Sequence, residues 1–359
     1  MSENSNSAQD AVRESVVRQS LDRASDSDAP AISVRGLIKR YQKAKVNAVD
    51  GVSFDVSKGE IFGLLGPNGA GKTTTIGILT TAIVPTQGAA AIMSVNVADD
   101  PISVKQRIAV VPQQSNLDRS LKVREILTFH AAYHGVPRKT REALADQLLN
   151  ELGLGDRKNE KVNRYSGGMA QRLMIARALM HEPDVLFLDE PTNNLDPQSR
   201  LFLWERIREM NSRGLTILLT THDMDEADKL CRRIAVMDHG KILVNDTPSE
   251  LKKLIPGGSV LEIRAYTARS NGGVPEKVRA ALSSLPGVTK IDAVSEDTAA
   301  AVASDAGAFS FRLYSPAANT LIGPAAQALL TAGAQVRDLS VKQPSLEEVF
   351  IFLTGRHLR

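Results

Sequence analysis

The segment from Gly66 to Thr74 carries residue types whose spacing suits phosphate chemistry. Its first eight residues, Gly66-Pro67-Asn68-Gly69-Ala70-Gly71-Lys72-Thr73, fit the pattern G-x-x-x-x-G-K-[ST]. Glycines let the backbone wrap closely around phosphates, with the N–H groups pointing inward as an anion nest. We expect Lys72 to reach the β- and γ-phosphates, Thr73 to bind Mg²⁺ and Thr74 to help hold the α- or β-phosphate. The loop alone does not distinguish kinases, GTPases and ATPases.

Two adjacent carboxylates, Asp189 and Glu190, end a second apolar run at Val185–Leu188. Carboxylates at the end of a buried strand lie at the ligand edge of an α/β sheet. We expect Asp189 to hold Mg²⁺ and Glu190 to orient and polarise an attacking water. A solvated Asp-Glu pair is a common alternative, but the phosphate loop upstream favours hydrolytic chemistry.

A third feature is Ser166-Gly167-Gly168, which precedes a strongly helical stretch ending near Met180. Ser166 can cap this helix and leave free N–H groups at its start, which would make a second anion site. A capped helix with a glycine-rich entry explains the same residues, and local physics alone favours that explanation.

Apolar patterning indicates which elements position these residues. Strands are predicted at Ala31–Val34, Val52–Val56, Ile61–Leu65, Ile108–Val111, Val185–Leu188 and Thr216–Thr220. Helices are predicted at Lys72–Thr81, between Val123 and Leu152, at Pro197–Arg213 and at Asp225–Cys231, followed by a hairpin that turns at His239-Gly240. This alternation predicts an α/β domain over 30–256 with a mainly parallel central sheet, and an inserted helical subdomain at about 115–180.

The flanking regions differ from this domain in pattern. Residues 1–29 are rich in Ser, Asp and Arg, which predicts a flexible tail. Beyond Gly257-Gly258, four predicted strands and two predicted helices follow the order β-α-β-β-α-β, with a last helix after Pro344. That order is typical of a small ferredoxin-like α+β domain, which we expect over 257–359. The predicted elements are the strands Val260–Tyr266, Val288–Val294, Phe309–Tyr314 and Val336–Val341 and the helices Pro275–Leu285 and Leu321–Ala332.

Composition narrows the class of protein. The 359 residues include 44 basic and 41 acidic ones, a balance too even to indicate nucleic-acid binding. The single cysteine, Cys231, excludes a disulfide within the chain and fits a reducing compartment. No run approaches the about 18 apolar residues needed to span a bilayer, and the N-terminus lacks the apolar core of a signal peptide. We therefore expect a cytoplasmic protein that reaches a membrane only through a partner.

Taken together, the motifs resemble those of the nucleotide-binding subunit of ABC transporters, a P-loop NTPase, over residues 32–255. The matching positions are Tyr41 for the adenine-stacking aromatic, Gly66–Thr74 for Walker A, Gln113 for the Q-loop, Ser166-Gly167-Gly168 for the signature, Val185–Glu190 for Walker B, Leu195-Asp196 for the D-loop and His222 for the switch histidine. Tyr165, Met169 and Asn193-Asn194 depart from the commonest residues at their positions. Asn is the best non-glycine residue for a left-handed turn, so that loop should survive. The residues after Tyr41 make a slightly longer loop than is usual in the family. The alternative to an adenine-stacking role is therefore an ordinary tyrosine at the end of a strand.

The resemblance implies a mechanism and partners. Two such domains, as a homodimer or a heterodimer, would sandwich two ATP molecules head to tail, each between one subunit's Gly66–Thr74 and the other's Ser166–Gly168. Glu190 would act as the base, His222 would contact the γ-phosphate, and Gln113 would link Mg²⁺ and the water to motions of the helical subdomain. That subdomain would grip a short helix of a separate integral-membrane permease, on the cytoplasmic side of the cell membrane.

The motif variants narrow the branch of the family. Tyr-Ser-Gly-Gly-Met, Thr-His-Asp-Met-Asp-Glu-Ala at 221–227 and Pro-Ser-Leu-Glu-Glu-Val-Phe at 344–350 resemble the branch of daunorubicin-resistance and nodulation-factor exporters. The alternative is a non-transport ATPase acting in translation or DNA repair, but a long heptad run and a second nucleotide domain, the marks of those classes, are both absent. Outside the motifs, His130 and His134 have a metal-binding spacing on a helix. No third ligand is evident nearby, so they are interpreted as surface residues.

Overall fold

The computed structural model describes residues 29–255, 258–266, 274–293, 308–315, 317–342 and 344–354. The tail predicted for 1–29 lies outside them, apart from Ala29. The described residues fall into two compact units, one running to Pro248 and the other starting at Ser249. The sequence placed a boundary at Gly257-Gly258, and Gly257 lies outside the described residues. Within these ranges, no helix is both long enough and apolar enough to cross a membrane.

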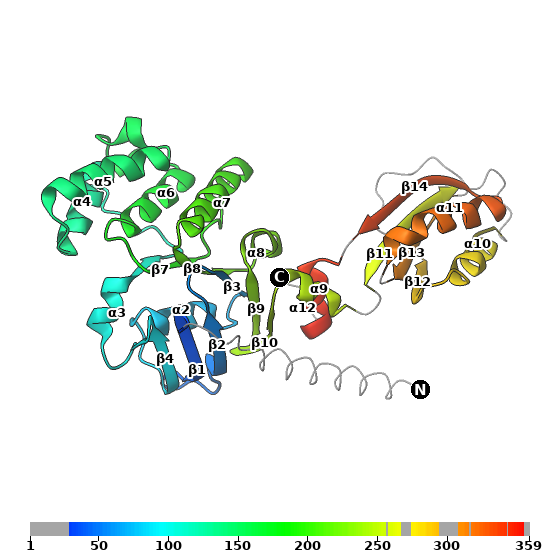
Figure 1. Cartoon of the computed structure of the whole chain (residues 1–359), viewed down its shortest axis with the longest axis horizontal. Coiled ribbons are helices and arrows are strands. Elements are labelled where there is room, and N and C mark those ends of the chain that lie inside the picture. Colours follow the sequence, from blue (N-terminus) through cyan, green and yellow to red (C-terminus); the bar gives the residue numbers. More distant parts are fainter. Residues whose placement is uncertain are drawn as a thin grey trace. The chain divides into compact units, whose positions relative to one another are not determined.

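The first unit is built on a six-stranded sheet with the order β10-β9-β3-β8-β7-β6 (Figure 1). The pairs β9–β3, β3–β8, β8–β7 and β7–β6 are parallel, and only the β9–β10 hairpin is antiparallel. The strands are β3 (Ile61–Leu65), β6 (Ile108–Val111), β7 (Val185–Asp189), β8 (Thr216–Thr221), β9 (Arg233–Asp238) and β10 (Lys241–Asp246). The mainly parallel sheet is as the sequence predicts.

Strands β3, β7 and β8 show why this sheet forms. All residues of these strands are buried, as expected when helices or a second sheet cover both faces of a parallel sheet. Their carboxyl ends are neighbours at one edge of the sheet, because β8 lies between β3 and β7. Every loop that follows one of these strands therefore begins at the same edge.

A second, antiparallel sheet with the order β2-β1-β4-β5 belongs to the same unit, and the sequence analysis did not predict it. Its strands are β1 (Ile32–Lys39), β2 (Val49–Val56), β4 (Gln87–Ile92) and β5 (Val95–Asn96). Strand β4 reads Gln-Gly-Ala-Ala-Ala-Ile, and Gly and Ala have low strand propensity, so local pattern does not reveal it. The stacked rings of Phe54 and Phe62, 5.2 Å apart, lie in the apolar cluster that joins the two sheets.

The first unit also contains helices, several of which contact strands of the six-stranded sheet. Figure 1 shows α4, α5 and α6 side by side in the region predicted as a helical subdomain, and these three helices are in mutual contact. The helices of the unit are α2 (Lys72–Leu79), α3 (Pro101–Arg107), α4 (Val123–Tyr133), α5 (Arg138–Glu151), α6 (Gly167–Ala178), α7 (Pro197–Ser212) and α8 (Met224–Leu230), with short 3₁₀ turns at Gly155–Arg157 and Val162–Arg164.

The second unit contains an antiparallel sheet with the order β12-β13-β11-β14. The element order β-α-β-β-α-β is the one that the sequence predicts for a ferredoxin-like domain. Leu261, Ile263 and Leu313 of the sheet share a buried cluster with Val278 and Leu329 of its two helices. The elements are β11 (Ser259–Tyr266), α10 (Val274–Ser283), β12 (Lys290–Ala293), β13 (Ala308–Ser315), the 3₁₀ turn Ala318–Leu321, α11 (Ile322–Thr331) and β14 (Gln335–Lys342), with α9 (Pro248–Lys253) before them and α12 (Leu346–Thr354) after.

Candidate active site

The phosphate loop leaves the end of β3 and enters α2 at Lys72. Gly69 and Gly71 have φ of 81° and 104°, a left-handed backbone that glycine adopts without strain. A Cβ at Gly71 would collide with the carbonyl oxygen of Ala48, and one at Gly66 with that of Met237. Glycine is therefore required at both positions for the turn to pack against its neighbours.

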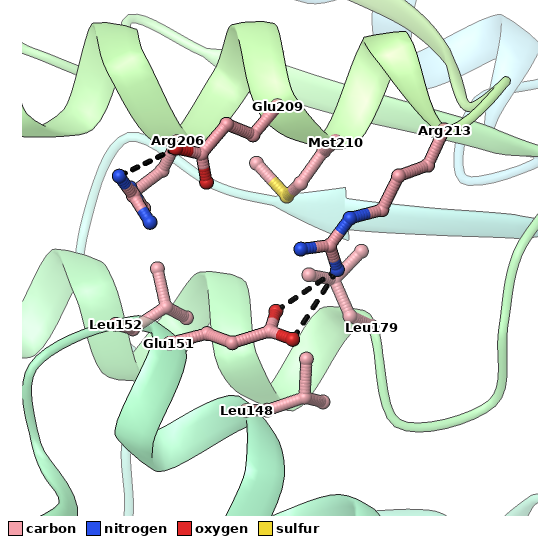
Figure 2. A pocket seen from close by; sticks show the side chains of 8 residues that line it. All are labelled: Leu148, Glu151, Leu152, Leu179, Arg206, Glu209, Met210 and Arg213. Carbon is pink, nitrogen blue, oxygen red and sulfur yellow. Dashed lines mark hydrogen bonds and ion pairs between the residues drawn. The ribbon is translucent and has the colours of Figure 1, made fainter.

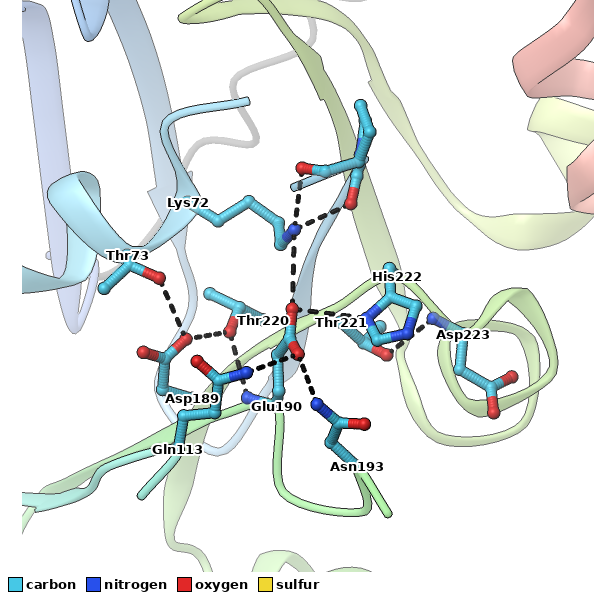
Figure 3. Close-up of polar contacts among 12 residues, drawn as sticks. Lys72, Thr73, Gln113, Asp189, Glu190, Asn193, Thr220, Thr221, His222 and Asp223 are labelled. Carbon is cyan, nitrogen blue, oxygen red and sulfur yellow. Dashed lines mark hydrogen bonds and ion pairs between the residues drawn. The ribbon is translucent and has the colours of Figure 1, made fainter. Parts of the chain in front are cut away.

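Lys72 is only 5% exposed and points back along this loop. Its Nζ donates to the carbonyl oxygens of Gly66 at 2.7 Å and Pro67 at 3.0 Å, and lies 3.7 Å from Oε1 of Glu190 (Figure 3). Burial lowers the pKa of the Lys72 ammonium, and the nearby Glu190 and Asp189 carboxylates oppose that shift. The loop thus holds a partly desolvated cation, which suits an anionic ligand.

Asp189 ends β7 and is held by two hydroxyl groups. Thr220, at the end of the neighbouring strand β8, donates to Oδ1 of Asp189 at 2.5 Å, and Thr73 donates to the same oxygen at 3.4 Å. Hydroxyl and carboxylate oxygens are the ligands that Mg²⁺ prefers, and Thr73 and Asp189 offer both within contact of each other. The residues present therefore fit a magnesium site.

Glu190 is the centre of the contacts drawn in Figure 3. Glu190 is 9% exposed, and its Oε2 accepts hydrogen bonds from Gln113 Nε2 and Asn193 Nδ2, both at 3.0 Å. Its Oε1 lies 3.2 Å from Nδ1 of His222. The residue has φ of 49°, uncommon for a non-glycine residue, and its backbone N–H is anchored at 3.1 Å to Thr220. Such anchoring keeps the carboxylate aimed at one point, as a general base requires.

The sequence-predicted residues thus divide into two groups. Lys72, Thr73, Gln113, Asp189, Glu190 and His222 form one connected set, because the loops after β3, β6, β7 and β8 begin at the same edge of the sheet. No hydrogen bond or ion pair recorded among the described residues joins this set to Ser166–Gly168 or to Asp196.

The second group lies at the starts of two helices. Ser166 caps α6 by accepting from Met169 N at 3.3 Å, and Asp196 caps α7 by accepting from Ser199 N at 2.9 Å. A Cβ at Gly168 would lie 2.8 Å from Oγ of Ser199, so these helix starts are neighbours. Ser166 and Gly167 are exposed, which leaves the start of α6 accessible.

Tyr41 follows β1, which ends at Lys39. Its ring is 44% exposed, and its hydroxyl is 3.5 Å from Oγ1 of Thr74. The side chain is thus adjacent to the first turn of α2, and the ammonium of Lys39 lies over its ring, 5.2 Å from the ring centre.

The sequence analysis missed two contacts of the site. Thr220 was assigned only to a strand, yet its side chain contacts both Asp189 and Glu190 N. Asn193 was noted only as a departure at a turn, yet it donates to Glu190. The turn itself is as predicted, because Asn194 has φ of 59°. A polar residue at the end of a strand next to β7 was the only sequence signal for Thr220.

A separate pocket lies between α5 and α7 (Figure 2). Two ion pairs line it, Arg213 with Glu151 at 3.1 Å and Arg206 with Glu209 at 2.6 Å. None of the sequence-predicted site residues lines this pocket. The charged side chains that line the pocket pair with each other, so they do not present an unpaired charge to a ligand.

Comparison with known proteins gives a consistent result. Residues 49–193 match a family described as ABC transporter. The daunorubicin/doxorubicin resistance ATP-binding protein DrrA of Streptomyces peucetius is 39% identical over 325 residues, covering 90% of this chain and 92% of that protein. The Nod factor export ATP-binding protein I of Burkholderia pseudomallei is 46% identical over 225 residues, 63% of this chain and 73% of that protein.

One solved structure resembles this chain in fold over part of its length. A dimeric ATP-binding cassette in a post-hydrolysis state, bound to ADP and phosphate, superposes with a TM-score of 0.56 at 26% identity. The match covers 60% of this chain and 98% of that one.

Proposed function

Because the chain belongs to the ABC transporter family of ATP-binding proteins and is an ATPase of that family, we propose that it powers export of a small, drug-like molecule through a separate membrane permease. Glu190 is the general base of its hydrolysis. The observation that carries this assignment is the Glu190 carboxylate, 9% exposed, fixed by Gln113 and Asn193 and within 3.2 Å of His222.

Hydrolysis requires a water to be oriented and deprotonated as it attacks the γ-phosphate. In the proposed reaction, Oε1 of Glu190 accepts the proton of that water, and the exposed His222 contacts the γ-phosphate from the other side of the carboxylate. Lys72 moves from the Gly66 and Pro67 carbonyls to the β- and γ-phosphates, which are stronger acceptors. The backbone N–H groups of 66–74 hold the remaining phosphate oxygens, and Tyr41 stacks on the adenine.

Thr73, Asp189 and Gln113 are the residues that would hold Mg²⁺. When bound, the ion neutralises charge on the β- and γ-phosphates. Thr220 keeps Asp189 in place through its 2.5 Å hydrogen bond. Such outer contacts orient a metal ligand before the ion arrives.

The complete site requires a second subunit, as a homodimer or a heterodimer. Ser166, Gly167 and Gly168 of that subunit close over the γ-phosphate with the free N–H groups of α6, and Asp196 contacts the opposing subunit. The exposure of Ser166 and Gly167, and their lack of contact with the Lys72–Glu190 set in the described residues, support this arrangement. An isolated subunit should then bind ATP and hydrolyse it poorly.

Transport is favoured over a role in translation or DNA repair because the matched relatives are named as resistance and export proteins. The chain would bind its permease through the helical subdomain, on the cytoplasmic side of the membrane. Co-purification of an integral-membrane protein supports this, whereas ribosomes or DNA in its place would contradict it.

The test is the Glu190→Gln variant, which keeps the shape and loses the base. We expect ATP turnover to fall by about 100- to 10,000-fold, since general-base contributions lie in that range. ATP affinity should stay near wild type, and light scattering should show an ATP-dependent dimer. The matched control, Glu205→Gln on the exposed face of α7, should hydrolyse normally. Unchanged turnover in Glu190→Gln would show that another group is the base.

A further inference from the structure

Three histidines converge in the helical region, away from the Lys72–Glu190 set. His130 lies in the last turn of α4, His134 is the residue that caps its C-terminus, and His181 lies between α6 and β7. One ring nitrogen from each lies within 4.8 Å of the others. The sequence analysis found no third ligand and interpreted His130 and His134 as surface residues. The fold supplies the third candidate ligand that the sequence did not reveal, because it brings His181 to them from a distant segment.

His181 is oriented by a backbone contact. Its Nε2 lies 2.9 Å from the carbonyl oxygen of Ile108, at the start of β6. A carbonyl can only accept, so Nε2 carries the hydrogen and the neutral ring has its lone pair on Nδ1. That Nδ1 is buried and has no hydrogen-bond partner in the described structure. Histidine ligands of metals are commonly fixed in this way, with one nitrogen donating to a carbonyl and the other left for the ion.

Burial acts on the other two rings. Burial, helped by His134 and Arg177, lowers the pKa of His130 to about 4. Burial and then the charge of His181 lower the pKa of His134. The rings of His134 and His181 are stacked with centroids 4.0 Å apart, and that of His130 lies 4.8 Å from His134. The three rings thus lie close together, with one nitrogen of each within 4.8 Å of the others.

The charges around the cluster bear on which ion it could hold. Arg177 of α6 lies near His130, and its guanidinium donates to Oδ1 of Asn116 at 2.5 Å. Tyr133 of α4 packs its ring edge on His134. No carboxylate is recorded among the partners of the three rings in the described residues. Imidazole ligands without carboxylates suit zinc, copper or nickel and not Mg²⁺ or Ca²⁺.

We propose that His130, His134 and His181 form a three-histidine site for one divalent transition-metal ion, best matched by Zn²⁺. His181 binds through Nδ1, and a fourth position stays open to water, as in zinc sites with three protein ligands. Zinc–nitrogen bonds of about 2.0–2.1 Å place tetrahedral ligands about 3.4 Å apart. The rings must therefore close in slightly, and His134 must turn out of its stack. The bound ion would tie α4 to the segment that leads into β7.

The test is Zn²⁺ binding to the full chain, stripped of metal and nucleotide, in competition with a chromophoric chelator. Wild type should bind one equivalent. His130→Gln, His134→Gln and His181→Gln should each weaken that equivalent by at least about 10-fold, the lower bound for losing even an outer contact of a metal site. The control is His239→Gln in the β9–β10 turn, which should bind as wild type does.

Co²⁺ supplies a second readout, because a four-coordinate Co²⁺ ion absorbs visible light strongly and the octahedral aqueous ion does not. Wild type and His239→Gln should develop this absorption, and the three cluster variants should not. Circular dichroism checks folding, and the exposed end of α4 makes His134→Gln the least disruptive variant. An equivalent of Zn²⁺ that persists unchanged in all three variants would overturn the proposal. ATP turnover plays no part in this result, so it is independent of the proposed function.

Discussion

A glutamate contacts a lysine both at the carboxyl edge of the parallel sheet and on the antiparallel sheet of the second unit. The two pairs differ in how far they are buried and in what else contacts them. At the carboxyl edge of the parallel sheet, Lys72 and Glu190 are 5% and 9% exposed, and backbone carbonyls, side-chain amides and His222 complete their contacts. On the antiparallel sheet of the second unit, Glu262 accepts from Lys342 at 2.8 Å and from Arg312 at 3.1 Å, and both cations are largely exposed. Loops that converge at strand ends can bury charged side chains. On the exposed face of a sheet, oppositely charged side chains pair with each other in contact with water.

The pKa shifts of two glutamates, one in each unit, make this difference measurable. Glu226 of α8 is 1% exposed, and Thr192 and Trp204 donate to it at 2.7 Å and 3.1 Å. Burial raises its pKa, and these hydrogen bonds only partly oppose the shift. For Glu262, partial burial opposes ionisation, but Lys342 and then Arg312 outweigh it and lower the pKa. The same side chain is thus shifted in opposite directions by the two settings.

The largest effect should come from removing the buried cation. Lys72→Ala should weaken ATP binding by about 100-fold, since truncating a buried charged partner costs about 2–5 kcal/mol. The matched variant is Lys342→Ala, which removes a cation that is 61% exposed and should leave ATP affinity unchanged. Fluorescent-nucleotide titration of both variants measures the contrast. An equal loss of ATP affinity in the two variants would show that the buried position of Lys72 does not explain its effect.

A smaller effect should follow from Glu226→Gln, which cannot ionise. The raised folded-state pKa means that the stabilisation of wild-type Glu226 is present below its unfolded pKa and is lost as pH rises through the folded value. Urea unfolding at pH 5 and pH 8 should therefore show Glu226→Gln gaining stability relative to wild type at the higher pH. The gain is about 1.4 kcal/mol for each unit between the folded and unfolded pKa values. A pH-independent difference would mean that Glu226 ionises freely in its buried position.

The smallest effect should come from Glu262→Gln, and its pH dependence should be opposite. A lowered folded-state pKa contributes stability above the unfolded pKa, which is lost as pH falls through the folded value. We expect a loss of about 1 kcal/mol or less at pH 7, because solvated ion pairs contribute little. High salt should reduce this loss further. Urea unfolding with and without salt checks it, and a loss of several kcal/mol would place Glu262 with the buried carboxylates.

The sequence predicted much of the fold where the signal is local. The β9–β10 hairpin turns at His239-Gly240 as expected, with φ of 46° and 79°, because that dipeptide tolerates a left-handed backbone. The order of elements in the second unit is also as predicted. Strand β4 escaped prediction because its Gly and Ala residues are held by pairing with β1, a contact that no local pattern encodes.

For the active site, the sequence named the residue types and the structure supplied their partners. The sequence motifs identify Lys72, Asp189 and Glu190, and the chemical roles of these residues remain predictions. Thr220 and Asn193 do not stand out, since a threonine in a strand and an asparagine in a turn are ordinary. They became part of the site only when β8 was placed between β3 and β7.

By itself, the sequence determined the phosphate loop, the carboxylates at a strand end and the alternation of strands and helices, because each depends on neighbouring residues and backbone sterics. Only the tertiary structure decided which strand ends meet, and therefore which side chains touch Asp189 and Glu190. It also decided that His181 joins His130 and His134. Such contacts join segments far apart in the chain, and they are set by strand order and helix packing, which short-range patterns do not specify.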